Sequence, residues 1–338
     1  MNLDLRQVTD GVYATSRAAM MVEVADVIVF DMDGVLMDVH HSYPVVICKA
    51  VDTFLREQGF SGDEPPVTPE ETAYFKAAGG FNHDWGLAQA ISLIYLVKAE
   101  LAGSRQIDEL RAASPDLPTL ARFSAQYGGG VGGLETALAH LIDPGQLRQV
   151  QERWDRPRIT RLGQEFYAGD RSSIVFGVSN DTIKGDGLML SEKPLVDRST
   201  LRRAPLRYGL YTGRNRGEVQ NAFDMADLDG VFAEEALVTE TLGIRKPSPE
   251  GLFVVQRALH PRLMIYAGDN LDDWQTAARY EAERAIDEPP CVFCGVLGGS
   301  PGPLSYGLFQ ERGVDLMTAS VPALLSWVTE RKSRLPAT

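Results

Sequence analysis

Two aspartates separated by one residue follow a short apolar run near the start of the chain. The run is residues 27–30 (VIVF), and it leads directly into residues 31–34 (DMDG). Such a run is typical of a strand buried in a parallel sheet, and open α/β sheets bind ligands at the carboxyl ends of these strands. Side chains two residues apart on an extended chain point to the same side, so Asp31 and Asp33 are expected to face one site. Neighbouring carboxylates repel unless a cation lies between them, and oxygen ligands favour Mg²⁺.

For this segment alone, the alternative is an Asp-Gly turn with solvated acids. Three later segments argue against that alternative, because their side chains suit the same chemistry. Residues 210–214 (LYTGR) end an apolar run in a hydroxyl, a glycine and a cation. Residues 243–249 (GIRKPSP) place a lysine before a proline, and residues 263–273 (LMIYAGDNLDD) end a third apolar run in acids.

In this order, the four segments resemble the four motifs of the haloacid dehalogenase superfamily of phosphohydrolases. The resemblance covers residues 25–38 and 205–338, and the combination is much more specific than any one segment. It implies that Asp31 is the nucleophile, which becomes an aspartyl phosphate, and that Asp33 is the general acid and base.

The resemblance also implies roles for residues of the other three segments. Thr212 and Lys246 would hold the phosphoryl oxygens. A Mg²⁺ site would consist of Asp31, the carbonyl of Asp33 and Asp269. Asp273 stands at the usual position of the second acid of the fourth motif and is predicted to join the metal site, while its neighbour Asp272 has no assigned place.

The chemistry supports these roles independently. Enzymes accelerate phosphate monoester hydrolysis by up to about 10²¹-fold, so several effects must converge. A carboxylate nucleophile divides the reaction into two displacements, and a second acid can protonate the leaving group and then activate water. Mg²⁺ and Lys246 would neutralise charge while Thr212 and the amide of Gly213 donate hydrogen bonds. Arg214 is a candidate for phosphate or substrate binding, with a solvated arginine at a helix start as the alternative.

The second acid discriminates among the relatives that the resemblance suggests. Dehalogenases lack it, phosphonate hydrolases have alanine there and P-type ATPases have threonine, so Asp33 favours phosphate esters. Phosphomutases of the beta-phosphoglucomutase type share both aspartates and usually add a histidine at the cap hinge. His40 and His41 are not obviously in that register, so phosphotransfer is the weaker alternative. A non-catalytic regulatory protein that binds phosphometabolites is a second alternative, which the intact set of catalytic candidates disfavours.

The spacing of the segments predicts the domain organisation. About 170 residues separate the first catalytic strand from the second, far more than an ordinary crossover needs. Val46, Ala50 and Leu55 recur at helical intervals, so the insertion is expected to be a mainly α-helical cap. Its position resembles the caps of the beta-phosphoglucomutase-like branch, although it is longer. The predicted domains are an N-terminal extension (1–22), a catalytic core (23–38 and 200–338) and the cap (39–199).

The core is predicted to be an α/β fold with a doubly wound, mainly parallel sheet, as in the Rossmann-like core of the superfamily. This follows from the alternation of apolar strand-like runs with helical patterns after residue 200. Strands are expected at about 207–212, 231–234, 263–267, 291–296 and 314–317, and helices at about 217–226, 249–259, 273–283 and 321–331.

Within the predicted cap, residues 79–85 (GGFNHDW) join the end of one helix to the start of the next. A glycine stop followed by an Asn or Asp helix cap explains the glycines. It does not explain the density of polar and aromatic side chains. Because a cap over such a site supplies specificity, we expect substrate contacts from four consecutive residues. These are Asn82, His83, Asp84 and Trp85.

Three other patterns receive structural interpretations. Residues 128–133 match the glycine spacing of a dinucleotide-binding loop, but no good strand precedes them, so an inter-helix loop is favoured. Cys291 and Cys294 have metal-site spacing within an apolar stretch and lack a second pair, which favours a buried strand. Alternating apolar residues in the segment 172–194 predict a short hairpin.

Composition limits the functional classes. The chain has 338 residues, 44% of them hydrophobic, and a net charge of −13. The negative charge argues against nucleic acid or an anionic membrane as a partner, so local cations would attract a small phosphorylated metabolite. The first ten residues lack the apolar core of a signal peptide, and a cytoplasmic location is expected. The sequence does not determine the metabolite, the oligomeric state or the role of the first 22 residues.

Overall fold

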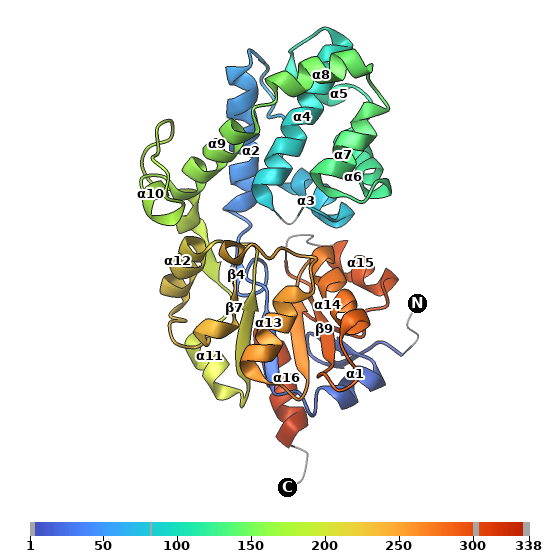
Figure 1. The fold of residues 1–338 in the computed structure, drawn as a ribbon, viewed down its shortest axis with the longest axis vertical. Coiled ribbons are helices and arrows are strands. Elements are labelled where there is room, and N and C mark those ends of the chain that lie inside the picture. Colours follow the sequence, from blue (N-terminus) through green and yellow to red (C-terminus); the bar gives the residue numbers. More distant parts are fainter. Residues whose placement is uncertain (1–3, 82, 300–303, 334–338) are drawn as a thin grey trace. The chain divides into compact units, whose positions relative to one another are not determined.

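The computed structural model describes residues 4–81, 83–299 and 304–333. The chain divides into two compact units (Figure 1). The core unit contains residues 1–38 and 193–338, and the inserted domain contains residues 39–192. The division expected from the sequence set residues 1–22 apart and ended the insertion at 199. The contacts instead group residues 1–22 and residues 193–199 with the core unit.

The inserted domain is helical throughout the elements that the structure describes. The long helix α4 is apolar on nearly every side, and its residues between Leu87 and Ala99 are buried. A helix buried all round must be surrounded by other helices, and α4 packs against α2, α7, α8 and α9. The elements are α2 (Tyr43–Glu57), α3 (Pro69–Ala78), α4 (Asp84–Ala102), α5 (Ile107–Ala112), α6 (Leu117–Gln126), α7 (Gly130–Ala139), α8 (Pro144–Arg153), α9 (Arg156–Ala168), α10 (Ser172–Val175) and the 3₁₀ helix η1 (Leu188–Ser191).

The core unit is built on a sheet in which eight strands of the described residues pair in the order β1-β2-β10-β9-β8-β3-β6-β7. A separate two-stranded sheet joins β4 and β5. The strands are β1 (Arg6–Thr9), β2 (Val12–Ala14), β3 (Val27–Phe30), β4 (Met37–Asp38), β5 (Lys193–Pro194), β6 (Arg207–Tyr211), β7 (Leu237–Val238), β8 (Met264–Gly268), β9 (Cys291–Val296) and β10 (Leu316–Thr318).

The helices of the core unit cover this sheet. One face of the sheet packs on α13, α14 and α15 through Val255, Tyr280 and Phe309. The helical elements are α1 (Ser16–Met21), α11 (Arg198–Arg203), α12 (Arg216–Ala226), η2 (Glu234–Ala236), η3 (Glu240–Leu242), α13 (Glu250–Leu259), α14 (Leu271–Glu283), α15 (Ser305–Glu311) and α16 (Val321–Ser333).

The central strands are parallel, and their order places a binding site at their carboxyl ends. β3 pairs in parallel with both β6 and β8, and every residue of β3, β8 and β9 is buried. If the six parallel strands β3, β6, β7, β8, β9 and β10 are renumbered 1 to 6 in chain order, their spatial order is 3-2-1-4-5-6. The order reverses between β3 and β8, which is where doubly wound sheets bind ligands. The predicted fold class, a mainly parallel α/β sheet with an inserted helical domain, is confirmed.

The first residues of the chain extend this sheet. β1 and β2 form an antiparallel hairpin, and β2 pairs antiparallel with β10, so that Ala14 lies opposite Leu316. Thr15 then caps α1, where its side chain accepts a hydrogen bond from the backbone of Ala18. Residues 6–21 are therefore part of the core unit and close the edge that β10 would otherwise present.

Two expected elements are wrong. The strand expected at 231–234 is absent. The strand that pairs with β6 at this edge of the sheet is β7, which begins a few residues later, at Leu237. Phe232 is buried against the rings of Phe30, Tyr208 and Phe223, so this apolar residue fills the core rather than a ladder. The hairpin expected within 172–194 is replaced by α10 and η1. The buried strand expected at Cys291 and Cys294 is confirmed as β9.

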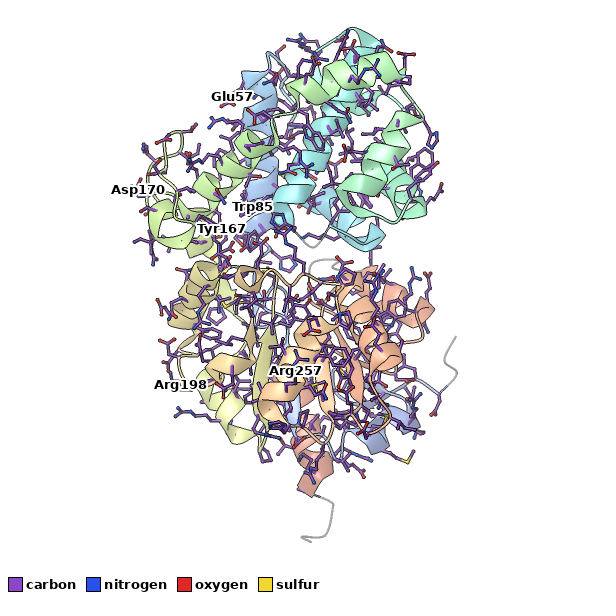
Figure 2. All side chains as sticks on the ribbon, viewed as in Figure 1. Glu57, Trp85, Tyr167, Asp170, Arg198 and Arg257 are labelled. Carbon is purple, nitrogen blue, oxygen red and sulfur yellow. The ribbon has the colours of Figure 1, made fainter. Side chains whose placement is uncertain are left out.

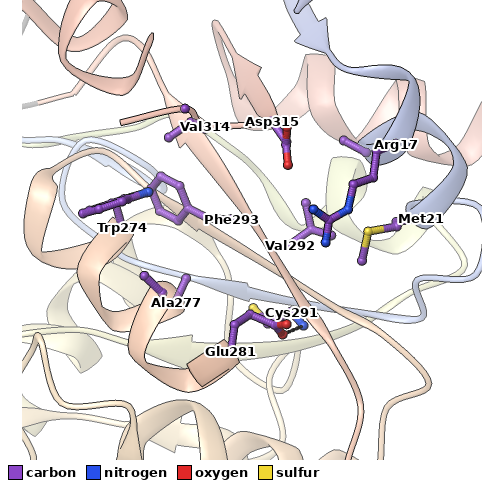
Figure 3. Close-up of a pocket in the computed structure, with 13 residues that line it drawn as sticks. Arg17, Met21, Trp274, Ala277, Glu281, Cys291, Val292, Phe293, Val314 and Asp315 are labelled. Atoms are coloured by element: carbon purple, nitrogen blue, oxygen red, sulfur yellow. Dashed lines mark hydrogen bonds between the residues drawn. The ribbon is translucent and has the colours of Figure 1, made fainter. Parts of the chain in front are cut away.

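A cavity of about 170 Å³ lies beside β9 and α14, away from the predicted catalytic residues. Trp274 and Phe293 line it together with the charged side chains of Arg17, Glu281 and Asp315 (Figure 3). In the part of the chain that the structure describes, no helix is both long enough and apolar enough to cross a bilayer.

Candidate active site

The carboxyl ends of three adjacent parallel strands bring the predicted catalytic residues to one edge of the sheet. Asp31 follows β3, Thr212 follows β6 and Asp269 follows β8. The strand pairing continues into these residues, since the N–H of Asp31 donates to the carbonyl of Ala267 at 2.9 Å. Backbone hydrogen bonds of the sheet therefore fix where each side chain leaves it.

A buried lysine joins two of the acids. The ammonium of Lys246 lies 2.7 Å from Oδ1 of Asp31 and 2.7 Å from Oδ1 of Asp273. The exposed fraction of each of these side chains is 5% or less. At such burial the charges interact strongly, because little water screens them. The arrangement fixes Lys246 beside the predicted nucleophile.

Burial and neighbouring charges oppose each other in this group. Burial raises the pKa of Asp31 well above its ordinary value, the ammonium of Lys246 counteracts that shift, and Asp273 adds to it. Burial would lower the pKa of Lys246, but the two facing carboxylates raise it above its ordinary value. Lys246 therefore stays protonated. One ammonium facing two buried carboxylates leaves an excess of negative charge, which favours an additional cation.

The start of α14 holds the acids of the fourth segment in place. Asn270 caps this helix, and its side chain accepts hydrogen bonds from the N–H groups of Asp272 and Asp273. In return, Oδ2 of Asp273 accepts from the N–H groups of Asp269 and Asn270 at 3.1 and 3.3 Å. This reciprocal capping box, with Asp in place of the usual Glu, places Asp273 at the helix N-terminus.

Asp269 and Asp273 complete a set of acids whose chemistry fits a metal ion. One carboxylate oxygen from each of Asp31, Asp269 and Asp273 lies within 4.8 Å of the other two, and all three residues are buried. Closely spaced oxygen ligands of this kind suit a hard cation such as Mg²⁺. Asp272 is not part of this set, and its backbone carbonyl accepts a hydrogen bond from Thr276.

Two tyrosines that sequence reasoning missed surround Lys246. Its ammonium lies 5.6 Å from the ring centroid of Tyr211 and 5.8 Å from that of Tyr266. The hydroxyl of Tyr266 also donates to Oδ1 of Asp273 at 2.6 Å. Burial raises the pKa of Tyr266 well above its ordinary value, so this hydroxyl keeps its proton. A tyrosine within a buried strand, whose hydroxyl requires a partner, was the available signal.

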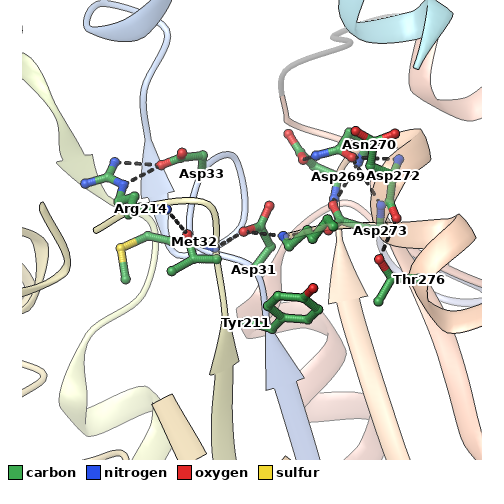
Figure 4. A network of polar contacts seen from close by, with 12 residues as sticks. Asp31, Met32, Asp33, Tyr211, Arg214, Asp269, Asn270, Asp272, Asp273 and Thr276 are labelled. Carbon is green, nitrogen blue, oxygen red and sulfur yellow. Dashed lines mark hydrogen bonds and ion pairs between the residues drawn. The ribbon is translucent and has the colours of Figure 1, made fainter. Parts of the chain in front are cut away.

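The guanidinium of Arg214 contacts the carboxylate of Asp33. The arginine side chain is 1% exposed, and its Nε and Nη2 lie 2.7 and 2.6 Å from Oδ1 of Asp33 (Figure 4). Sequence reasoning assigned Arg214 to substrate binding, whereas the structure shows this contact with the second acid. Thr212 is buried, and its hydroxyl accepts from the N–H of Arg214 at 3.2 Å. Gly213, between them, is exposed.

Gly34 lies so close to Asp269 that a larger residue would displace the carboxylate. Its φ is +71°, a conformation that favours glycine, and a Cβ at this position would collide with Oδ2 of Asp269 and with the backbone of Gly299. Gly230 has almost the same φ, +70°, with no other atom within 4 Å of its would-be Cβ. A comparison of substitutions at Gly34 and Gly230 therefore separates the cost of backbone strain from the cost of the collision with Asp269.

We expect Gly34→Ala to destabilise the protein more than Gly230→Ala. The left-handed conformation alone should cost roughly 1–2 kcal/mol in either variant. Collision with Asp269 should add about 1–3 kcal/mol in Gly34→Ala, as overpacking does in a dense core. Denaturant unfolding of both variants measures the difference. Equal losses would show that Gly34 does not confine the Asp269 carboxylate.

The residues expected to contact substrate lie in the inserted domain. His83 caps α4, and its Nδ1 accepts from the N–H of Gly86 at 3.1 Å. Asp84 pairs with Lys76 at 2.8 Å. Trp85 is 7% exposed and its ring lies near that of Tyr167 (Figure 2). The rings of Tyr43 and Phe176 complete this aromatic cluster. Asn82 lies outside the described residues. These substrate contacts stay a prediction.

Comparisons with known proteins cover most of the chain. A family model described as haloacid dehalogenase-like hydrolase matches residues 25–280. A solved Northeast Structural Genomics Consortium target is 16% identical with a TM-score of 0.57, and the match covers 90% of this chain and 100% of that one. Phosphatase Tt82 from Thermococcus thioreducens is 23% identical with a TM-score of 0.49, covering 79% of this chain and 92% of that chain. No curated protein matches.

Proposed function

The chain belongs to the haloacid dehalogenase-like hydrolase family, and from this premise we propose that it is a Mg²⁺-dependent phosphatase. Its substrate would be a small phosphorylated metabolite, and the reaction would pass through an aspartyl phosphate on Asp31. The observation that supports this proposal most strongly is the buried group of Asp31, Lys246 and Asp273, with 2.7 Å between the ammonium and each carboxylate.

In the first displacement, a carboxylate oxygen of Asp31 attacks phosphorus and the bond to the leaving oxygen breaks. Lys246 is protonated and lies beside the nucleophile, so it can neutralise charge on the transferring group without reorganising. Its two carboxylate partners and the rings of Tyr211 and Tyr266 hold the ammonium in place. The hydroxyl of Thr212 and the amide of Gly213 would hold phosphoryl oxygens.

Asp33 would serve both displacements. It gives a proton to the leaving alkoxide in the first, and in the second it takes a proton from the water that attacks the aspartyl phosphate. That attack releases inorganic phosphate and restores the Asp31 carboxylate. Asp33 is two residues after the nucleophile, and its side chain is 25% exposed, which suits a group that exchanges protons with substrate and water.

Mg²⁺ would be held by Asp31, Asp269 and the carbonyl of Asp33. When bound, it supplies positive charge to the transferring phosphoryl group. Asp273 belongs to the same set of acids. Its carboxylate already forms an ion pair with Lys246 and accepts hydrogen bonds from Tyr266 and from two backbone N–H groups, so we assign it chiefly to holding Lys246.

The inserted domain would select the substrate through His83, Asp84 and Trp85. A cytoplasmic location stays a prediction, and so does the expected lack of nucleic-acid and membrane partners. The phosphomutase alternative shares Asp31 and Asp33, so it must be separated from hydrolysis by the product formed.

A substrate panel tests the proposed function. Purified protein is incubated with phosphorylated sugars, polyols, nucleotides and amino-acid precursors, with Mg²⁺ or with EDTA, while phosphate release and phosphorylated products are both measured. We expect release with at least one substrate and a fall of at least about 10²-fold in EDTA, because the cation stabilises developing charge. Readdition of Mg²⁺ should restore the rate.

Other outcomes point elsewhere. Isomerised product without phosphate release would favour the phosphomutase. Ligand binding without turnover on any member of the panel would favour a regulatory protein. Undiminished hydrolysis in EDTA would contradict the assignment of the acidic cluster to Mg²⁺.

A further inference from the structure

Hydrogen bonds fix the backbone of Arg214, which lies just after the end of β6. Its N–H donates to the hydroxyl of Thr212 at 3.2 Å, and its carbonyl accepts from the N–H of Glu240 at 2.9 Å. The next residue, Asn215, forms a reciprocal capping box with Glu218 at the start of α12. Both sides of Arg214 are therefore fixed by hydrogen bonds, and its side chain is 1% exposed.

The guanidinium of this residue converges on one oxygen of Asp33. Nε lies 2.7 Å and Nη2 lies 2.6 Å from Oδ1, although the two residues are 181 positions apart in the sequence. Two donors from one planar group restrict both the position and the rotation of the carboxylate, which a single flexible ammonium would not do. Asp33 is one-quarter exposed, so without this partner its side chain could turn.

We infer that Arg214 is the positioning residue of Asp33 and does not bind the transferring phosphate. The inference rests on the proposed function and deepens it. With Oδ1 held by Arg214, proton exchange with the substrate falls to Oδ2. The proton passes from Oδ2 to the leaving oxygen as its bond to phosphorus breaks, and Oδ2 later takes a proton from the attacking water.

A positioning role predicts that the leaving group decides how much activity is lost. An alkoxide leaves poorly unless it is protonated, whereas 4-nitrophenolate leaves without help. Loss of Arg214 should therefore slow aspartyl phosphate formation from an alkyl phosphate and largely spare 4-nitrophenyl phosphate. If Arg214 held the phosphate instead, both substrates would suffer alike. kcat/KM is the proper measure, because it reports steps up to the first irreversible one.

The experiment compares Arg214→Met with Arg214→Lys on glycerol 2-phosphate and 4-nitrophenyl phosphate, with Mg²⁺ present. We expect kcat/KM of Arg214→Met on glycerol 2-phosphate to fall about 10²-fold, within the usual contribution of general acid catalysis. The fall on 4-nitrophenyl phosphate should be much smaller, and Arg214→Lys should recover part of the loss. The ratio of the two values is independent of how much protein is folded.

Arg216 provides a matched control. It lies two residues away, its side chain is 44% exposed, and it pairs with Glu234, which is 73% exposed. Arg216→Met should leave both rates unchanged. Equal losses on the two substrates in Arg214→Met, expressed as a rise in KM, would overturn the inference and return Arg214 to phosphate binding.

A double-mutant cycle with Asp33→Ala completes the test. Alanine is chosen because an asparagine before Gly34 would be prone to deamidation back to aspartate. On glycerol 2-phosphate, the double variant should be no slower than Asp33→Ala alone, since both changes remove the same function. Additive losses would overturn the inference.

The four proteins of this cycle are the wild type, Arg214→Met, Asp33→Ala and the double variant. They also separate failure of the inference from failure of the proposed function. If the wild type hydrolyses neither substrate nor any member of the panel, the proposed phosphatase activity fails. Unfolding of the same cycle then decides whether Arg214 holds Asp33. Non-additive effects on stability would support the pair, and additive effects would overturn it.

Discussion

Replacing Asp31 with asparagine should abolish turnover, with kcat falling about 10⁴-fold to 10⁶-fold, as when other nucleophiles are removed. The amide has nearly the same size as the carboxylate, but it is a poor nucleophile and cannot form the aspartyl phosphate. Phosphate release with Mg²⁺ measures the loss. Intact mass after rapid acid quenching should detect a phosphoryl group on the wild type and none on Asp31→Asn.

The fold should survive this change. Lys246 keeps its contact with Asp273 at 2.7 Å, so its ammonium does not become an unpaired buried charge. Asp287 is exposed, and Asp287→Asn should match the wild type in both activity and phosphoenzyme formation. Full turnover by Asp31→Asn, confirmed by mass to retain the amide, would exclude Asp31 as the nucleophile.

Replacing Lys246 with methionine should have the second largest effect. It leaves Asp31 and Asp273 facing each other without the ammonium that lies 2.7 Å from each. Removing one partner of a buried ion pair typically costs about 3–5 kcal/mol of stability. Loss of a positioned charge at the transferring group should lower kcat by about 10²-fold to 10³-fold. Denaturant unfolding and steady-state kinetics measure the two effects separately.

Lys98 supplies a control for the burial of a lysine. It is 7% exposed in the inserted domain, and its ammonium donates to the carbonyls of Leu110 and Ala113 at 2.8 and 2.7 Å. Burial lowers the pKa of Lys98, whereas facing acids raise that of Lys246. Lys98→Met should therefore lose stability but keep kcat per folded molecule. If Lys246→Met kept kcat as well, its charge would have no part in phosphoryl transfer.

The sequence predicted the parts of the fold that local patterns determine. An unbroken apolar run predicts a strand buried on both faces, and β3, β8 and β9 are such strands. Polar residues directly after such a run must lie at its carboxyl end, which is why Asp31 and Asp269 could be expected at one edge. A separation of about 170 residues between strands predicted an inserted domain, because no crossover needs that length.

Contacts between distant segments had no local signal. The pairing of Arg214 with Asp33 requires β3 and β6 to be neighbours, and it requires the segments that follow these two strands to turn toward each other. Nothing in the spacing of the LYTGR segment distinguishes an arginine aimed at a substrate from one aimed at a carboxylate. The contact of Lys246 with Asp273 likewise depends on two separate segments meeting.

Short apolar runs were ambiguous for a different reason. Residues 231–238 contain two of them, and only the second pairs with β6. Phe232 is buried all the same, so burial does not distinguish a strand from a residue that fills the core. Ile174 and Phe176 have strand-like spacing, but Ile174 lies within the single helical turn α10 and Phe176 caps its end. Ile174 is 73% exposed, whereas the ring of Phe176 contacts Trp85.

The strand pairing also sets an order in which the chain can fold during synthesis. β3 is made early, but its two neighbours in the sheet begin at residues 207 and 264, and β2 must wait for β10 at residue 316. The helices of the inserted domain pack on one another and are complete by residue 192. Since local contacts form faster than distant ones, the insertion can gain its core on the ribosome while the catalytic strand still lacks partners. The nucleophile therefore acquires its neighbours late, and the edge of the sheet is closed only when almost the whole chain has emerged.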